Sequence, residues 1–223
     1  MKRPPNFNRL ARMYETLEAT TFGAKLWQCR CAFLPELTNR RTALVLGDGD
    51  GRFTARLLDE NATVLVDAVD ASLEMLRELV RNAGLRSGRV RVHLADAREW
   101  EPHSPAYDLI VTHFFLDCLT TADVAALAAR LRTHVSPNAL WVVSEFAIPR
   151  GWYGWLVARP LVQSLYLAFL VLTGLRVQRL PRYRSMMEAA GFVRVAERSF
   201  LGGLLVSELW RPGSGVHSRM PAG

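Results

Sequence analysis

The sequence predicts an α/β fold in which a parallel β-sheet is covered by helices on both faces. Three observations predict it: short apolar runs alternate with helical stretches from Thr42 onward, a glycine-rich turn follows the first run, and the second run ends at Asp70. Apolar strands separated by helices are typical of parallel sheets buried on both sides. The 223 residues, 50% of them hydrophobic, are enough for one such domain with a sizeable core.

The elements of this pattern follow one another in order. We expect strands over residues 43–46, 64–69, 90–94, 107–112 and 140–146, with residues 90–94 alternating in and out and the fifth strand preceded by a turn at Pro137-Asn138. We expect helices that begin near Phe53 and that cover residues 72–83, 122–134 and 183–190. Strands over 192–200 and 204–210, joined at Gly202-Gly203, end the pattern as a hairpin.

Three segments stand apart from this alternation. Residues 1–41 are expected to form a helical extension, with Tyr14 among its inward residues. The extension either covers the pocket over the strand ends or only packs against the domain. Residues 150–182 form an insertion within a domain of residues 42–211, and residues 212–223, rich in Pro, Gly and Ser, form a flexible tail.

Charge and cysteine content set limits on function. A net charge of +7 attracts nucleic acid, anionic lipid or acidic substrates without distinguishing among them. Cys29, Cys31 and Cys118 fit neither a disulfide framework nor a zinc site, so we expect incidental thiols in a reducing cytosol and no metal. No apolar run follows the basic first ten residues, which predicts a chain without a signal peptide and a cytoplasmic location.

The run from Gly47 to Gly51 is the expected cofactor loop. Its glycines let a ligand approach the backbone where side chains would block it. Asp70, nineteen residues after Gly51, suits a ribose diol, and Asp96, after the third strand, suits an adenine amino group. The alternative is structural, since Asp70 can cap a helix and Asp96 a turn. Three such features at consecutive strand ends favour a nucleoside site.

The spacing of the glycines separates two kinds of cofactor. Dinucleotide sites have the pattern G-x-G-x-x-G, whereas this loop has G-x-G-x-G with Asp48 and Asp50 between the glycines. Two carboxylates repel a pyrophosphate but tolerate a cationic sulfonium or ammonium group. The loop therefore favours S-adenosylmethionine over a nicotinamide dinucleotide.

These motifs resemble those of the class I S-adenosylmethionine-dependent methyltransferases. The matching stretches are residues 44–51, Val69-Asp70-Ala71-Ser72, Ala95-Asp96-Ala97 and residues 107–111. The resemblance covers Thr42 to Arg211 and is greatest for the small-molecule branch that includes ubiquinone/menaquinone-biosynthesis methyltransferases. It implies a Rossmann-like, seven-stranded sheet with an antiparallel last strand. It also implies S-adenosyl-L-methionine as cofactor and S-adenosyl-L-homocysteine as product.

The resemblance also assigns roles within the cofactor site. It implies that the three glycines line the methionine end, that Asp70 with Ala71 holds the ribose, and that Asp96 with Ala97 lies beside the adenine. One position departs from the family, because Val45 stands where an acidic residue is usual. We expect Asp48 to take over part of that electrostatic role.

The loop from Thr112 to Asp117 is expected to face the transferring methyl group. His113 is its best-placed titratable group, a candidate catalytic base and cofactor contact, although it can equally bond backbone at a strand end. Phe114, Asp117 and Glu145 are candidate acceptor-binding residues, and Asp117 also suits a helix cap. The loop lacks the Asn/Asp-Pro-Pro-Tyr/Phe signature of amino-methylating enzymes, which disfavours nucleic acid as a partner.

The segment of residues 150–184 carries six arginines, several aromatic residues and no acidic residue. Its apolar stretch, Leu161 to Leu172, is shorter than the roughly twenty residues of a membrane-spanning helix. Three interpretations remain open: a lid over a hydrophobic acceptor with Trp152 as a contact, a peripheral membrane contact, or a dimer surface or core helix. We favour the lid, with membrane contact as its companion.

The leading functional hypothesis is methyl transfer to a small, hydrophobic acceptor. One alternative is a catalytically silent, methyltransferase-like subunit that binds cofactor or a partner, which Val45 and the lack of an obvious base keep open. The other is a nicotinamide-dependent oxidoreductase, which the glycine spacing disfavours. The acceptor and the oligomeric state do not follow from the sequence.

Overall fold

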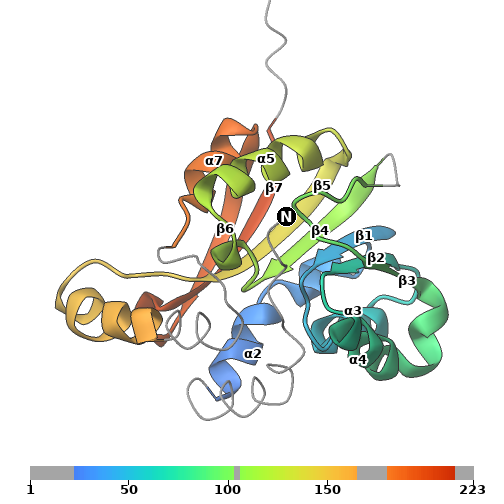
Figure 1. Cartoon of the computed structure of the whole chain (residues 1–223), viewed down its shortest axis with the longest axis horizontal. Coiled ribbons are helices and arrows are strands. Elements are labelled where there is room, and N and C mark those ends of the chain that lie inside the picture. Colours follow the sequence, from blue (N-terminus) through green and yellow to red (C-terminus); the bar gives the residue numbers. More distant parts are fainter. Residues whose placement is uncertain (1–22, 103–105, 165–179, 214–223) are drawn as a thin grey trace, which may run out of the picture.

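A computed structural model describes residues 23–102, 106–164 and 180–213, which form one seven-stranded sheet with helices on both faces (Figure 1). The strand order is β3-β2-β1-β4-β5-β7-β6. The strands are β1 Thr42–Leu46, β2 Leu65–Asp70, β3 Val90–Leu94, β4 Tyr107–His113, β5 Val135–Phe146, β6 Phe192–Phe200 and β7 Leu205–Pro212. Strand β7 runs antiparallel to both of its neighbours, which confirms the expected sheet and its terminal hairpin.

Local signals in the sequence explain where the helices begin and end. The helices are α2 Ala24–Arg30, α3 Arg52–Glu60, α4 Leu73–Ala83, α5 Thr121–Arg132 and α7 Tyr183–Ala189. Ser72 caps α4 by accepting a hydrogen bond from the Met75 backbone N–H, and Gly84 ends it at a φ of 55°. A reciprocal capping box between Thr120 and Asp123 begins α5.

Two hydrophobic cores lie on opposite faces of the sheet. Figure 1 shows α5 and α7 on one face and α2, α3 and α4 on the other. The α3 side packs Phe53 and Leu57 against β1, β2 and β4, and the α5 side packs Leu127 and Met187 against Trp141 and Trp210. The two tryptophans pair directly across β5 and β7 and are fully buried. Loss of either indole is expected to cost about 3–5 kcal/mol.

Two strands differ from the expectation. Strand β5 begins at Val135, so Pro137-Asn138 lies inside it, at an irregularity in the pairing with β4 rather than in a separate turn. The pairing of Tyr107 with Val135 decides this, because tertiary contacts override the turn preference of the dipeptide. Strand β3 shows no buried face, because it is the edge of the sheet, and Val92 and Leu94 are exposed.

The extension and the insertion are described in part. Within the extension, α2 and a 3-10 turn over Leu34–Leu37 bury Leu26, Phe33 and Leu37, while Tyr14 lies outside the described residues. The insertion is helical over residues 152–164, including the π-helical turn Gly154–Ala158. We call residues 152–164 the tryptophan helix. Residues 165–179 and 214–223 lie outside the description.

In the portion of the chain that the structure describes, no helix combines the length and the apolar character needed to cross a bilayer.

Candidate functional site

The glycine loop leads from β1 into α3 at the carboxyl-terminal edge of the sheet. Gly47, Gly49 and Gly51 have φ values of 65°, 65° and 77°, a region that favours glycine. No described residue lies within 4 Å of where a Cβ on Gly49 would sit. The backbone at Gly49 is therefore the part of the loop that a ligand can approach.

The other two glycines pack against protein. A Cβ on Gly51 would lie 2.5 Å from the Cα of Leu79 in α4, and one on Gly47 would meet the ring of Phe115. The absence of a side chain at Gly51 thus lets α3 and α4 approach, and at Gly47 it makes room for the loop after β4. The three glycines that the sequence treats alike have different surroundings.

Asp48 is a buried carboxyl between these glycines. Its Oδ2 atom accepts hydrogen bonds from the backbone N–H (2.9 Å) and the hydroxyl (2.6 Å) of Thr54, the third residue of α3. Its Oδ1 atom is buried and bonds to no described residue. Burial raises the pKa of Asp48 to about 6, partly offset by Thr54 and by the charge of Arg30. One oxygen of Asp48 thus holds the first turn of α3, and the other is left for a ligand.

Asp70 lies at the end of β2, close enough to Asp48 for the two charges to repel. Burial raises the pKa of Asp70 to about 6, although the hydrogen bond from the Ser72 backbone N–H opposes this rise. That bond, from Ser72 N to Asp70 Oδ1, measures 2.8 Å. Two carboxyls with raised pKa values at one sheet edge indicate a site with too little positive charge of its own.

Asp96 follows β3, and its carboxylate is held by Arg98. The Arg98 Nε–H lies 3.0 Å from both carboxylate oxygens, and the Arg98 backbone N–H donates to Oδ1 at 2.9 Å. The Arg98 hydrogen bonds hold the pKa of Asp96 below its usual range. The turn-capping role is therefore present in the structure. Ala97 beside it is buried against the α5-side core, and Ala71, after Asp70, is exposed.

His113 ends β4 and is buried on the α3 side of the sheet. Its ring stands edge-on to Phe53, with centroids 4.3 Å apart. His113 Nδ1 forms a 2.9 Å hydrogen bond with Ser144 Oγ, a hydroxyl that also lies 3.1 Å from Ser207 Oγ and 3.4 Å from the carbonyl oxygen of Cys29. The other ring nitrogen, Nε2, is buried and has no described hydrogen-bond partner. Burial, with the charge of Arg30, holds the pKa of His113 well below 6.5, so the ring is neutral at pH 7.

The loop after β4 is held by the carboxyl of Glu145 in β5. Glu145 Oε1 accepts hydrogen bonds from the backbone N–H groups of Phe115 (3.2 Å) and Leu116 (2.7 Å). Phe114 has a φ of 53°, which is uncommon for a residue with a side chain, and its ring packs on Phe146 with centroids 5.0 Å apart. A backbone conformation of this kind is held in place by the surrounding packing.

Asp117 lies close to Glu145, inside the 3-10 turn Leu116–Cys118. The cap of α5 is Thr120, so the expected capping role of Asp117 is wrong. Burial raises the pKa of Asp117 to about 6, and burial together with Asp117 raises that of Glu145 well above its usual range. Both shifts favour the neutral form of the carboxyl concerned. The structure brings Asp117 and Glu145 together, whereas Phe114 packs on Phe146 and Trp152 is 73% exposed on the tryptophan helix.

Three residues of this edge were not predicted. Arg30 of α2 is buried, acts electrostatically on Asp48 and His113, and its guanidinium lies 5.6 Å from the ring centre of Phe114. Thr54 and Ser144 supply the hydrogen bonds to Asp48 and His113. The one available signal was an arginine on the apolar face of the predicted extension. The partners of Thr54 and Ser144 depend on tertiary pairing.

Comparison with protein families and curated proteins gives two matches. The family described as "Methyltransferase domain" matches residues 43–138. The ubiquinone/menaquinone biosynthesis C-methyltransferase UbiE of Idiomarina loihiensis is 30% identical over 175 residues, which cover 71% of this chain and 67% of that protein. The residues that the family matches include the glycine loop, Asp70 and Asp96.

Solved structures share the fold at low identity. The mitomycin 7-O-methyltransferase MmcR aligns with a TM-score of 0.68 and 19% identity over 93% of this chain. The S-adenosylmethionine-dependent methyltransferase SibL aligns with 0.64 and 20% over 96%. The PH0226 protein of Pyrococcus horikoshii aligns with 0.69 and 15% over 93% of this chain and 100% of its own. This chain spans 61% of MmcR and 64% of SibL.

Proposed function

This chain belongs to the class I S-adenosylmethionine-dependent methyltransferases, and we propose that it methylates a small, hydrophobic acceptor by in-line displacement. The sulfonium of the bound cofactor supplies the activated methyl group. What remains for the protein is to hold donor and acceptor in line and to exclude water. The observation that carries the proposal is the open backbone at Gly49 beside two carboxyls, Asp48 and Asp70, whose pKa values are raised.

The cofactor end of the site is assigned as follows. The backbone at Gly47 and Gly49 approaches the methionine portion, and Asp48 Oδ1 offers a buried acceptor to its cationic groups. Asp48 stands in for the missing family acid, because Val45 is fully buried in the core. Gly51 acts indirectly, by letting α4 support the loop.

The nucleoside part of the cofactor is assigned to residues that follow β2 and β3. Asp70 retains an oxygen beyond its bond to Ser72 and is assigned to the ribose hydroxyls, with Ala71 beside it. Asp96 is held by Arg98, so an adenine amino group has to share its carboxylate with the guanidinium. Ala97 supplies apolar surface next to it.

The acceptor side is assigned to the apolar cluster next to the loop after β4. This cluster joins Leu26 of α2, Phe114, Phe146 and Ala158 of the tryptophan helix. The extension and the insertion thus share one cluster with the loop, which supports their proposed role as walls around an apolar acceptor. The names of UbiE and MmcR, a C- and an O-methyltransferase acting in ubiquinone/menaquinone biosynthesis and on mitomycin, fit an acceptor of this kind.

His113 is assigned to the acceptor as a hydrogen-bond acceptor through Nε2. A pKa held well below 6.5 makes a weak base, so proton abstraction by His113 is the less favoured role. A neutral nitrogen that is buried without a partner is suited to accept an O–H or N–H from a bound molecule. Glu145 and Asp117 shape the loop from the opposite side of the sheet.

The cofactor assignment is tested by calorimetry with S-adenosylhomocysteine. We expect the wild type to bind this ligand and Asp70→Ala to lose binding. Asp67→Ala is unsuitable as a control, because Asp67 accepts hydrogen bonds from Tyr107 and Arg91 inside the protein. Asp59→Ala, an exposed carboxyl, is the matched control. No binding of S-adenosylhomocysteine at millimolar concentration would overturn the assignment.

The acceptor assignment is tested by transfer of a labelled methyl group. Phenols, hydroquinones and hydrophobic amines are supplied with S-adenosylmethionine, and labelled product is extracted into an organic solvent. Transfer to these acceptors but not to short RNA or DNA supports the proposal. Cofactor binding with no transfer to any acceptor would favour the silent, methyltransferase-like subunit instead.

A further inference from the structure

One face of the tryptophan helix is apolar and open to solvent. Trp152 is 73% exposed, Trp155 67% and Leu156 58%, and Ile148, just before the helix, is 45% exposed. Positions three and four apart lie on one side of a helix, so Trp152, Trp155 and Leu156 form one surface. Large apolar residues gathered in this way on a surface mark an interaction site. We call these four residues the tryptophan patch.

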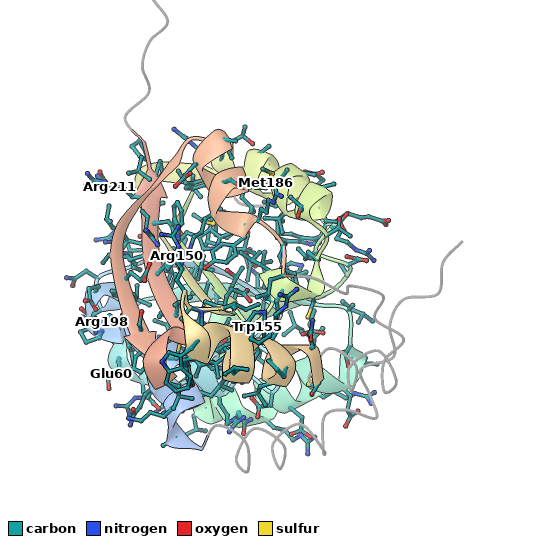
Figure 2. All side chains as sticks on the ribbon, turned by 90° about the vertical axis from the view of Figure 1, so that its left-hand side faces the viewer. Glu60, Arg150, Trp155, Met186, Arg198 and Arg211 are labelled. Carbon is teal, nitrogen blue, oxygen red and sulfur yellow. The ribbon has the colours of Figure 1, made fainter. Side chains whose placement is uncertain are left out.

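The helix that carries the patch is anchored by its other side. Ala158 and Val162 are buried in the cluster with Leu26 and Leu205, and the Tyr153 hydroxyl donates to the Leu201 carbonyl at 3.2 Å. The patch is thus held outward by packing. Figure 1 shows the helix at one end of the molecule, and Figure 2, which views that side, labels Trp155 on it and Arg150 in the segment that leads into it.

The charges around the patch are of one sign. Between Glu145 and Glu188 the sequence contains six arginines and no Asp or Glu. Arg150, just before the helix, and Arg159, within it, are exposed, and Arg182, also exposed, lies at the start of α7, where its backbone N–H donates to Thr121. Arg159 follows Trp155 by four residues and therefore borders the patch on the same side of the helix. The patch is an apolar surface with a positively charged rim.

We propose that the tryptophan patch rests in the interface of a lipid bilayer that contains anionic phospholipids, with Arg150 and Arg159 on the phosphates. Tryptophan is favoured at this depth because its ring is apolar and its N–H can remain in the hydrated layer. Each arginine near an anionic surface adds attraction that salt screens. The contact is peripheral, and it holds whatever acceptor the enzyme methylates.

Two other occupants fit the charges less well. A two-fold dimer through this patch would place the same surface of each copy together, and arginines would then face arginines with no acid between them. Residues 1–22 carry four basic and two acidic residues, so their net charge is also positive. A negatively charged bilayer complements the rim, whereas both of these partners repel it.

The test is flotation of the full chain with vesicles at low salt. The vesicles are phosphatidylcholine alone, or phosphatidylcholine and phosphatidylglycerol in equal parts. We expect the wild type to float with the mixed vesicles, and the variants Trp152→Ala/Trp155→Ala and Arg150→Glu/Arg159→Glu each to lose roughly tenfold or more in partitioning. The control Arg41→Glu/Arg211→Glu changes two exposed arginines elsewhere and should float as the wild type does. Calorimetry with S-adenosylhomocysteine checks that every variant is folded.

Three outcomes would overturn the proposal. The first is equal partitioning of the wild type onto neutral and anionic vesicles. The second is an unchanged partitioning of the Trp152→Ala/Trp155→Ala variant. The third is a wild-type dimer in light scattering that the tryptophan substitutions dissociate while vesicles float no protein, since that assigns the patch to a second copy. None of these measurements depends on methyl transfer, so failure of this proposal leaves the proposed function untouched.

Discussion

Glu145 accepts a hydrogen bond from the backbone N–H of Leu116 at 2.7 Å, and this bond fixes the loop after β4 to the neighbouring strand. The same oxygen also accepts from Phe115, so a single buried atom satisfies two backbone donors. Burial and the neighbouring Asp117 raise the pKa of Glu145 well above its usual range, which favours the neutral form of the group that accepts these bonds.

Replacement of Glu145 should therefore depend on shape and not on charge. Glu145→Gln keeps a carbonyl oxygen for both N–H groups and should lower the free energy of unfolding by less than ~1 kcal/mol. Glu145→Leu leaves both donors buried without an acceptor, which costs about 2–5 kcal/mol. Urea unfolding measures the difference. Equal losses in the two variants would contradict the role of Glu145 as an acceptor for the two N–H groups.

Gly49→Ala should affect the cofactor more than the fold. Gly84 provides the matched control, since it also has a positive φ, 55°, and no described neighbour within 4 Å of its Cβ position. Both alanines should cost about 1–2 kcal/mol of stability through backbone strain. Affinity for S-adenosylhomocysteine, measured by calorimetry, should fall at least tenfold in Gly49→Ala only. A similar affinity in both variants would remove Gly49 from the site.

Gly51→Ala, in contrast to Gly49→Ala, should lower the stability of the fold more than the affinity for the cofactor. The added methyl group meets the backbone of Leu79, which cannot turn away as a flexible side chain can. Overpacking of this kind costs about 1–3 kcal/mol, to which the strain of a φ of 77° is added. Thermal unfolding should show a clearly lower midpoint than that of Gly49→Ala. An equal midpoint would mean that α3 and α4 separate without penalty.

The two cofactor carboxyls predict a pH dependence of binding. Asp48 and Asp70 have pKa values of about 6 without ligand, and a bound cation favours their ionised forms and lowers those pKa values. Affinity should then be full above pH 7 and fall as the pH drops through 6, by roughly tenfold per pH unit for each carboxyl that must lose its proton. S-adenosylhomocysteine lacks the sulfonium charge and should show a weaker fall. Calorimetry from pH 5 to pH 8 with both ligands measures this, and parallel profiles would refute it.

His113→Ala should separate catalysis from cofactor binding. If Nε2 orients the acceptor, kcat/KM for the acceptor falls by roughly tenfold to a hundredfold while affinity for S-adenosylhomocysteine stays within a factor of two. His113→Gln, which retains an amide oxygen as hydrogen-bond acceptor, should recover part of the rate. A loss of stability with an unchanged rate per folded molecule would reduce His113 to its contacts with Phe53 and Ser144.

Much of the fold could be predicted because local and global signals agree there. Ser72 caps the start of α4 and Gly84 caps its end, both through local interactions. The glycine loop likewise marks in the sequence where β1 ends and α3 begins. At Pro137-Asn138 the two conflict, and the strand prevails because Val135 pairs with Tyr107. A turn preference of one dipeptide is weaker than a paired strand.

The sequence predicts which residues of the site follow the strand ends, but it does not predict their pKa values or their hydrogen-bond partners. Asp48 and Asp70 follow from spacing, whereas their raised pKa values require the burial that α2 and the loops create. The bond of Glu145 to the N–H of Leu116 arises only when β4 and β5 lie side by side, 29 residues apart in sequence. Arg30 reaches Asp48 from outside the methyltransferase motifs altogether.

The antiparallel last strand has a consequence for synthesis of the protein. β5 pairs with β7 along one of its sides, and β7 leaves the ribosome only after the 58 residues that separate Phe146 from Leu205. At about 5–20 residues per second this takes several seconds, during which one edge of β5 has no partner. An open strand edge next to the indole of Trp141 is a template for aggregation. We therefore expect the nascent chain to need a holding chaperone in this interval, and slow translation of residues 147–204 to lower the yield of folded enzyme.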